Sequence, residues 1–128
     1  MKIILDTHIF LWLITDNDRL SDKSKHAFTN SDNELFFSIA SYWEICIKIS
    51  IGKLKLSKNW DKIIKDELMV NSVKLLPIST EHCLQITQLP FHHRDPFDRI
   101  IISQAIIEQM HIMTINSYFS QYEVNIVW

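Results

Sequence analysis

Short apolar runs alternate along the chain with longer segments in which apolar residues recur every three or four positions. The short runs predict strands, and the longer segments predict helices with one buried face. Strands are expected at Lys2–Leu5, Glu34–Ser38, Val73–Ile78, Ile112–Ile115 and Val124–Trp128. Helices are expected at Ile9–Ile14, Ser21–Phe28, Ala40–Ile51, Trp60–Val70, Thr80–Leu89 and Pro96–Met110. This alternation favours an α/β fold with a mostly parallel sheet.

Three local features sharpen this picture. Gly52, the only glycine, stands where the helix Ala40–Ile51 should end, as a C-terminal cap residue does. Pro90 ends the helix before it, because proline cannot continue the backbone hydrogen bonds. The helix Pro96–Met110 is apolar on almost every face, which predicts a central position in the fold.

Composition and charge narrow the class of protein. The 128 residues suffice for one domain with a sizeable core, and an apolar share of 47% excludes a disordered chain. A net charge of −2 excludes a generally basic nucleic-acid-binding protein, so such a role needs a local site. Cys46 and Cys83 form no disulfide or zinc pattern. Without an apolar run of roughly 18 residues, and with Asp6 interrupting the N-terminal run, we expect a cytoplasmic protein with no membrane partner.

Acidic residues stand at the ends of the predicted elements. Asp6 follows the first strand, Glu44 lies in the first turn of the helix after the second strand, and Asp95 and Asp98 open the long helix. Asn116 follows the fourth strand. In open α/β sheets the functional crevice lies at the carboxyl ends of the strands. We therefore expect these side chains to meet at one edge of the sheet.

Each of these acids also has a purely structural interpretation. Ser41 and Glu44 fit a capping box, in which Glu44 would fold back onto the amide of Ser41. Asp95 before a proline is a typical N-cap, and Asp98 would then stand three positions into the helix, where negative charge is favourable. Asp6 could cap a helix that starts close behind it. Caps alone, however, do not require the acids to converge.

Convergence of several carboxylates carries a chemical consequence. Like charges in one pocket repel each other, and a bound divalent cation removes that penalty. Carboxylate oxygens with retained water are the ligands that Mg²⁺ and Mn²⁺ prefer. Such a site activates water and offsets the charge that develops on a phosphodiester. The sequence therefore raises the hypothesis of metal-assisted hydrolysis.

Three segments carry a more specific pattern, and a fourth is compatible with it. They are the opening Asp6-Thr7-His8 with Leu11-Trp12, the stretch SIASYWEI at 38–45, the block HHRDPFDR at 92–99, and the ending Thr114-Ile115-Asn116. In this order and at this spacing, the chain resembles PIN-domain ribonucleases of the VapC type, the toxins of type II toxin–antitoxin pairs. The resemblance runs through the whole chain, so it implies a single PIN domain over residues 1–128.

The resemblance implies a three-layer α/β/α fold with a parallel sheet of four or five strands. It also implies an endoribonuclease that depends on Mg²⁺ or Mn²⁺ and leaves a 5′-phosphate and a 3′-hydroxyl. The first three acids of the family fall on Asp6, Glu44 and Asp98, which are the expected catalytic and metal-binding residues. Thr7 and Thr114 are placed to orient carboxylates or water.

The fourth family position departs from the usual pattern. It generally carries aspartate, and here it carries Asn116. A neutral amide removes one charge from the site and binds a metal less strongly, which puts a second metal ion in doubt. Asp95, one helical turn before Asp98, could partly compensate, although an N-cap role is the stronger interpretation.

RNA binding would need cations near the acids. From Lys48 to Lys65 six lysines stand against a single aspartate, a local excess of five positive charges. Such a stretch is by default a solvated face, and the resemblance favours a rim that tracks phosphates. We expect Lys48, Lys53 and Arg99 to contact RNA, unless Lys48 and Arg99 simply pair with neighbouring acids. The family further implies two protein partners, a second copy in a homodimer and a cognate antitoxin.

Two other functions compete with the ribonuclease. A catalytically impaired PIN-like module that binds RNA or protein is favoured only by Asn116. A phosphatase with an aspartyl nucleophile is disfavoured because Asp6-Thr7-His8 lacks the second aspartate of that motif. A zinc site is disfavoured because His92 and His93 are adjacent and no second His or Cys pair has ligand spacing.

Overall fold

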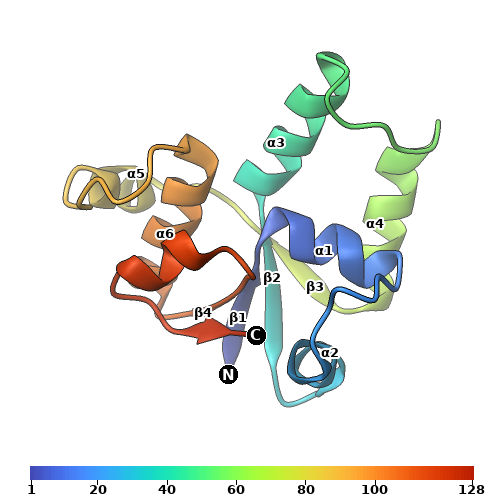
Figure 1. Cartoon of the computed structure of the whole chain (residues 1–128), viewed down its shortest axis with the longest axis horizontal. Coiled ribbons are helices and arrows are strands. Elements are labelled where there is room, and N and C mark those ends of the chain that lie inside the picture. Colours follow the sequence, from blue (N-terminus) through green and yellow to red (C-terminus); the bar gives the residue numbers. More distant parts are fainter.

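The computed structural model describes residues 1–128 as three layers built around a parallel sheet (Figure 1). The five strands pair in the order β3-β2-β1-β4-β5. The strands are β1 (Lys2–Leu5), β2 (Glu34–Ser38), β3 (Val73–Leu76), β4 (His111–Met113) and β5 (Ile126–Val127). The helices are α1 (Thr7–Ile14), α2 (Asp22–Thr29), α3 (Ile39–Ser50), α4 (Trp60–Val70), α5 (Thr80–Ile86), α6 (Pro96–Glu108) and the 3₁₀ helix η1 (Ser117–Gln121). This architecture confirms the predicted three-layer α/β/α fold.

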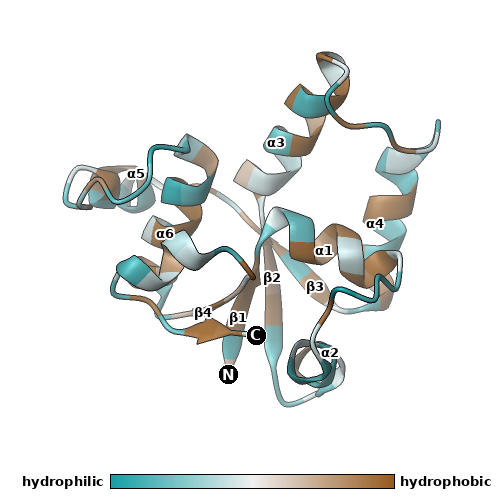
Figure 2. Ribbon diagram, in the orientation of Figure 1, coloured by the Kyte–Doolittle hydropathy of each residue, from teal (hydrophilic) through white to brown (hydrophobic).

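Both faces of the sheet are buried, which explains why its strands are continuous apolar runs. On β1, Ile3 and Leu5 join the apolar cluster beneath α1, α3 and α4, whereas Ile4 joins the cluster beneath α6 and η1. Figure 1 shows α1 to α4 on one side of the sheet and α5, α6 and η1 on the other. Apolar residues are concentrated along the strands in Figure 2. None of the helices is both long and apolar enough to span a membrane.

The central position predicted for the last long helix is confirmed. Seven consecutive residues of α6, from Arg99 to Ala105, are buried. Asp95 is its N-cap and Pro96 its first residue, so this helix begins as the sequence predicts. The helix ends at Glu108, and the next residue, Gln109, adopts the left-handed conformation with a φ of 55°.

Several predicted elements are shorter than expected. The strand predicted to Ile78 ends at Leu76, because Pro77 has no amide hydrogen to continue the ladder. The helix predicted to Leu89 ends at Ile86, and the strand predicted at Ile112–Ile115 lies at His111–Met113. Gly52 lies just beyond α3 with a φ of +75°, as a glycine that ends a helix does.

The predicted capping box at Ser41 is wrong. The N-cap of helix α3 is Ser38, three residues before Ser41, and its hydroxyl oxygen accepts a hydrogen bond from the amide of Ala40 at 3.0 Å. The helix therefore begins at Ile39. Glu44 consequently lies in the second turn of α3 rather than the first. The buried hydroxyl of Ser41 has no hydrogen-bond partner.

The topology locates a crevice. The first strand, β1, lies at the centre of the sheet and pairs with β2 on one side and with β4 on the other. Strands β2 and β3 are added on one side of β1, and β4 and β5 on the other, so the strand order reverses at β1. In open α/β folds, the crevice at the carboxyl ends of strands on either side of such a reversal is where ligands bind.

Candidate active site

Asp6 anchors the crevice at the end of β1. Its carboxylate is almost fully buried, at 4% exposure, and also caps α1. One oxygen accepts the amide hydrogen of Thr7 at 2.8 Å, and the other accepts the hydroxyl of Thr114 at 2.8 Å. The backbone amide of Asp6 donates to the carbonyl of Met113 at 3.0 Å, which extends the contact between β1 and β4. Both oxygens of Asp6 are therefore held in a fixed orientation.

Glu44 approaches Asp6 from α3 and is equally buried, at 4% exposure. Its Oε1 accepts the hydroxyl of Thr7 at 2.8 Å, and its Oε2 pairs with the ammonium of Lys48 at 3.0 Å. Thr7 thus bridges the two acids, with its amide on Asp6 and its hydroxyl on Glu44. These contacts of Thr7 and Thr114 are the orienting contacts that the sequence predicts.

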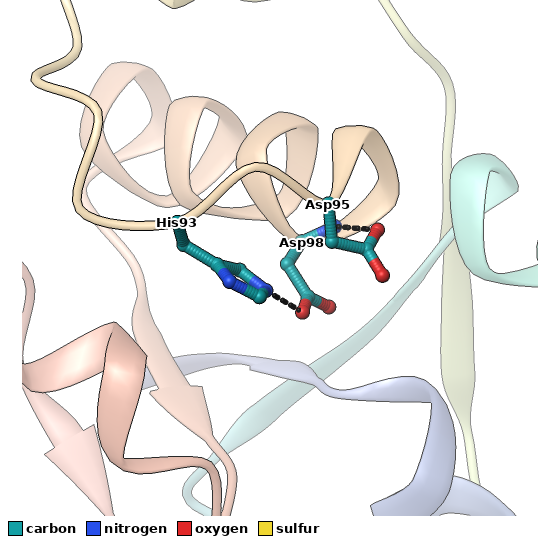
Figure 3. A group of neighbouring side chains, drawn as sticks. All are labelled: His93, Asp95 and Asp98. Carbon is teal, nitrogen blue, oxygen red and sulfur yellow. Dashed lines mark hydrogen bonds and ion pairs between the residues drawn. The ribbon is translucent and has the colours of Figure 1, made fainter.

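The third acid, Asp98, comes from the first turn of α6 and lies beside a residue that sequence reasoning missed. Its Oδ2 is 2.7 Å from Nε2 of His93, in the loop before the helix (Figure 3). Asp95 uses Oδ1 to accept the amides of Phe97 at 2.8 Å and Asp98 at 3.3 Å. One possible ligand atom from each of His93, Asp95 and Asp98 lies within 4.8 Å of the others.

Asn116 reaches the crevice just beyond β4. Its amide oxygen accepts the backbone amide of Tyr118 at 3.0 Å and so caps η1. Its own backbone amide donates to the hydroxyl oxygen of Thr114 at 3.0 Å. Asn116 therefore lines the cleft, and its side-chain oxygen also caps η1.

These residues line one cleft of about 410 Å³. The cleft contains the acids and amide singled out in the sequence, together with Lys48 and four other side chains. The lining residues are Asp6, His8, Trp12, Glu44, Lys48, His93, Asp95, Asp98, Ile115 and Asn116. The convergence predicted from strand ends and helix starts is thus present in the structure.

The crowding of acids changes their affinity for protons. Burial raises the pKa of Asp6, the hydrogen bond from Thr114 opposes that rise, and the charge of Glu44 adds to it. Burial, followed by the charge of Asp6, raises the pKa of Asp98 to about 7, and the hydrogen bond with His93 opposes this rise. The cleft therefore holds more negative charge than it stabilises by itself. A set of carboxylate oxygens in this condition fits a hard divalent cation such as Mg²⁺ or Mn²⁺.

The predicted RNA contacts fall in three different places. Lys48 lines the cleft and pairs with Glu44, as its i,i+4 spacing predicts. Lys53 is exposed on the loop after α3 and lies outside the cleft lining. Arg99 is buried, at 4% exposure, so the prediction that it contacts RNA is wrong, and it does not pair with Asp98 either.

Arg99 instead holds the loop between α5 and α6. Its Nη1 donates to the carbonyl of Pro90 at 2.9 Å, to the carbonyl of His93 at 3.3 Å and to the hydroxyl of Tyr122 at 3.3 Å. Its Nη2 donates to the carbonyl of Ile86 at 3.3 Å. This guanidinium clamp fixes the segment that carries His93. The three isoleucines that follow Arg99, on a helix that is apolar on almost every face, are the sequence signal that could have indicated its burial.

Comparison with known proteins adds a family and a set of structural neighbours. The family model described as the PIN domain matches residues 3–125. Among curated proteins no match is found. Solved structures that are similar over nearly the whole chain include VapBC assemblies and a toxin–antitoxin complex, at sequence identities that establish the fold alone.

Three of these neighbours illustrate the likeness. VapBC2 from Rickettsia felis, bound to a DNA fragment from their promoter, has a TM-score of 0.72 at 18% identity, covering 98% of this chain and 97% of that one. VapBC-1 from nontypeable Haemophilus influenzae has a TM-score of 0.68 at 22% identity, covering 98% and 96%. A toxin–antitoxin complex from Klebsiella pneumoniae has a TM-score of 0.64 at 16% identity, also covering 98% and 96%.

Proposed function

Because the chain belongs to the PIN-domain family, we propose that it is a metal-dependent endoribonuclease and the toxin of a toxin–antitoxin pair. The proposal treats residues 1–128 as a single PIN domain acting in the cytoplasm. The observation that carries it is the convergence of Asp6, Glu44 and Asp98 in one cleft at the carboxyl edge of the sheet. These three carboxylates are the proposed catalytic and metal-binding residues.

The cation proposed for this cleft is Mg²⁺ or Mn²⁺, held by Asp6, Glu44 and Asp98. When bound, it supplies Lewis-acid chemistry for attack of water on a phosphodiester. The protein's own groups hold the reactants in place. Thr7 and Thr114 fix the carboxylates of Glu44 and Asp6, and the hydrolysis breaks the bond between phosphorus and the 3′ oxygen, which leaves as a hydroxyl.

RNA as substrate is supported by the charge around the cleft. Lys48 lies in the cleft itself, and Lys53 begins the exposed lysine-rich stretch that leads from α3 into α4. Cations beside an acidic cleft offset the repulsion between the acids and an incoming phosphate chain. We propose that these lysines guide the RNA backbone while the acids act on one phosphodiester.

An antitoxin partner is supported by an apolar groove beside the cleft. The groove has a volume of about 410 Å³ and lies between α1, α4 and the loop that precedes α4. Its apolar lining comes from Leu11, Trp12, Ile14, Leu54, Leu56, Trp60, Ile63 and Ile64. His8 and Trp12 line both the groove and the cleft, so a protein segment in the groove would lie next to the acids. Exposed apolar surface of this kind is typical of sites that bind protein partners. We propose a second copy of the chain, in a homodimer, as the other protein partner.

A catalytically impaired PIN-like module that binds RNA or protein is the alternative. Asn116 favours it, because a neutral amide removes one charge from the cleft and binds a cation less strongly than a carboxylate does. Under the enzyme proposal, Asn116→Asp restores a charge to the cleft and raises the cleavage rate. Under the alternative, this change leaves RNA intact and alters only binding.

The test is cleavage of cellular RNA by purified, antitoxin-free protein in Mg²⁺, in Mn²⁺ and in EDTA. The enzyme proposal expects cleavage that requires the metal, vanishes in Asp6→Asn and persists in Asp66→Asn, a matched change at an exposed acid on α4. Fragment ends should carry a 5′-phosphate. Folded wild-type protein that cleaves nothing in either metal would favour the binding module.

A further inference from the structure

His93 lines the cleft but has no part in the proposed mechanism. Resting on the proposed metal-dependent function, we propose that His93 is a direct ligand of the divalent cation through Nε2. It acts beside Asp98 and Asp95 at the start of α6. An imidazole in the ligand set biases the site toward Mn²⁺ over Mg²⁺, because nitrogen ligands suit transition metals and Mg²⁺ prefers oxygen alone.

The spacing of His93 and Asp98 is close to that of two neighbouring ligands on one ion. Ligands at neighbouring positions on an ion with bonds of about 2.1 Å are separated by roughly 3 Å. Nε2 of His93 and Oδ2 of Asp98 are 2.7 Å apart, and a ligand atom of Asp95 lies within 4.8 Å of both. In Figure 3 the ring of His93 and the carboxylate of Asp98 point toward each other, and the carboxylate of Asp95 lies to one side of this pair.

Contacts other than the bond to Asp98 fix the position of His93. Its ring stacks on Tyr118 at 4.6 Å between centroids with an interplanar angle of 8°. Its backbone amide donates to the hydroxyl of Tyr122 at 3.0 Å, and its carbonyl accepts from the Arg99 clamp at 3.3 Å. The ring therefore keeps its orientation when a cation takes over the carboxylate. A preorganised ring of this kind loses little entropy on binding.

The position also answers the loss of the fourth family acid. On the β4 side of the cleft, Asn116 offers an oxygen that already accepts the amide of Tyr118. On the α6 side, His93 and Asp98 are only 18% and 13% exposed and face the same cleft. The ligand set of this chain is therefore shifted from the β4 side toward the start of α6.

A different role for His93 makes the opposite prediction. A protonated imidazole would merely neutralise Asp98, and an incoming cation would have to displace it. Removing such a group would strengthen metal binding. Removing a ligand instead weakens metal binding. Loss of a residue that only supports a ligand typically lowers metal affinity roughly 10–100-fold, and loss of a ligand itself should cost at least as much.

The experiment uses metal-free protein titrated with Mn²⁺ and followed by pulsed electron paramagnetic resonance. We expect a ¹⁴N coupling on the bound Mn²⁺ that disappears when the protein is made with ¹⁵N-labelled histidine. The coupling should also disappear in His93→Gln and persist in His8→Gln, a matched change at an exposed histidine of the same cleft. His93→Gln should raise the Kd for Mn²⁺ by about tenfold or more and the Kd for Mg²⁺ by a smaller factor.

The outcomes separate this inference from the proposed function. The role of His93 is overturned if Mn²⁺ binds in an Asp6-dependent manner without a ¹⁴N coupling, or if it binds more tightly to His93→Gln. Either result leaves the metal-dependent function standing. Wild-type protein that binds no Mn²⁺ overturns the role of His93, and protein that binds neither Mn²⁺ nor Mg²⁺ overturns the proposed function as well. If His93→Gln fails to fold, a wild-type coupling that persists in both His8→Gln and His92→Gln still assigns the nitrogen to His93, because the three remaining histidines do not line the cleft. Loss of the coupling in either variant overturns the assignment.

Discussion

Replacing Arg99 tests whether the buried guanidinium serves the fold rather than the substrate. Arg99→Met keeps most of the aliphatic volume and removes every donor. Arg99→Lys keeps the charge and cannot reach four acceptors at once. Arg94→Met is the matched control, because Arg94 is a neighbouring arginine with an exposed side chain.

The cost of losing Arg99 follows from its contacts. A hydrogen bond that involves a charged group contributes about 1.5–3 kcal/mol. Only the bond to the carbonyl of Pro90, at 2.9 Å, is short. The other three bonds are 3.3 Å long, and we expect each to contribute about half of that free energy or less. Since exposed carbonyls regain water, we expect Arg99→Met to lose about 3–5 kcal/mol of unfolding free energy and Arg99→Lys about 1–3 kcal/mol.

Urea unfolding measures the stability, and RNA binding at several salt concentrations measures the contact with phosphates. Arg99→Lys should fold and keep the salt dependence of the wild type, because a buried group releases no counterion. Arg94→Met should stay within about 0.5 kcal/mol of the wild type. The reasoning is refuted if Arg99→Met loses less than about 1 kcal/mol while RNA affinity falls and its salt dependence becomes shallower.

Three further predictions concern stability. Since the pKa of Asp98 is raised to about 7, the folded state holds more protons than the unfolded state between about pH 4 and 7. Metal-free protein should therefore lose on the order of 2–4 kcal/mol of unfolding free energy as the pH rises through that range. In urea titrations, Asp98→Asn should remove most of this dependence on pH. Thermal melts should show Ser38→Ala destabilised by about 1 kcal/mol and Ser41→Ala neutral or stabilised, because only Ser38 caps α3. In thermal melts, Ser72→Gly should be more stable than the wild type by about 0.5–1 kcal/mol, because Ser72 has a φ of 55°, which glycine adopts without strain.

The elements whose pattern is purely local are predicted well from the sequence. The strands at Lys2–Leu5 and Glu34–Ser38 and the helix at Trp60–Val70 have the predicted bounds. Their apolar runs and helical spacing are complete within each segment. The Asp95-Pro96 start of α6 is equally local, because an N-cap and a proline act on adjacent backbone.

The errors arise where two local signals compete or where the partner is distant in space. Ser38 and Ser41 both precede helix-forming residues, and the capping pattern alone does not choose between them. A charged residue such as Arg99 is usually exposed, so its burial depends on carbonyls presented by a loop that the sequence does not place. His93 reaches Asp98 only because that loop turns back over the start of α6.

The hydrogen bond between Thr114 and Asp6 joins residues 108 positions apart, the first strand to the turn after the fourth. During translation Asp6 emerges 108 residues before its partner. The strand β1 cannot complete its pairing until β4 has left the ribosome, and contacts of such sequence separation form late. For the proposed ribonuclease, this order of assembly protects the message that encodes it, because the nascent chain stays inactive until β4 and Thr114 have left the ribosome.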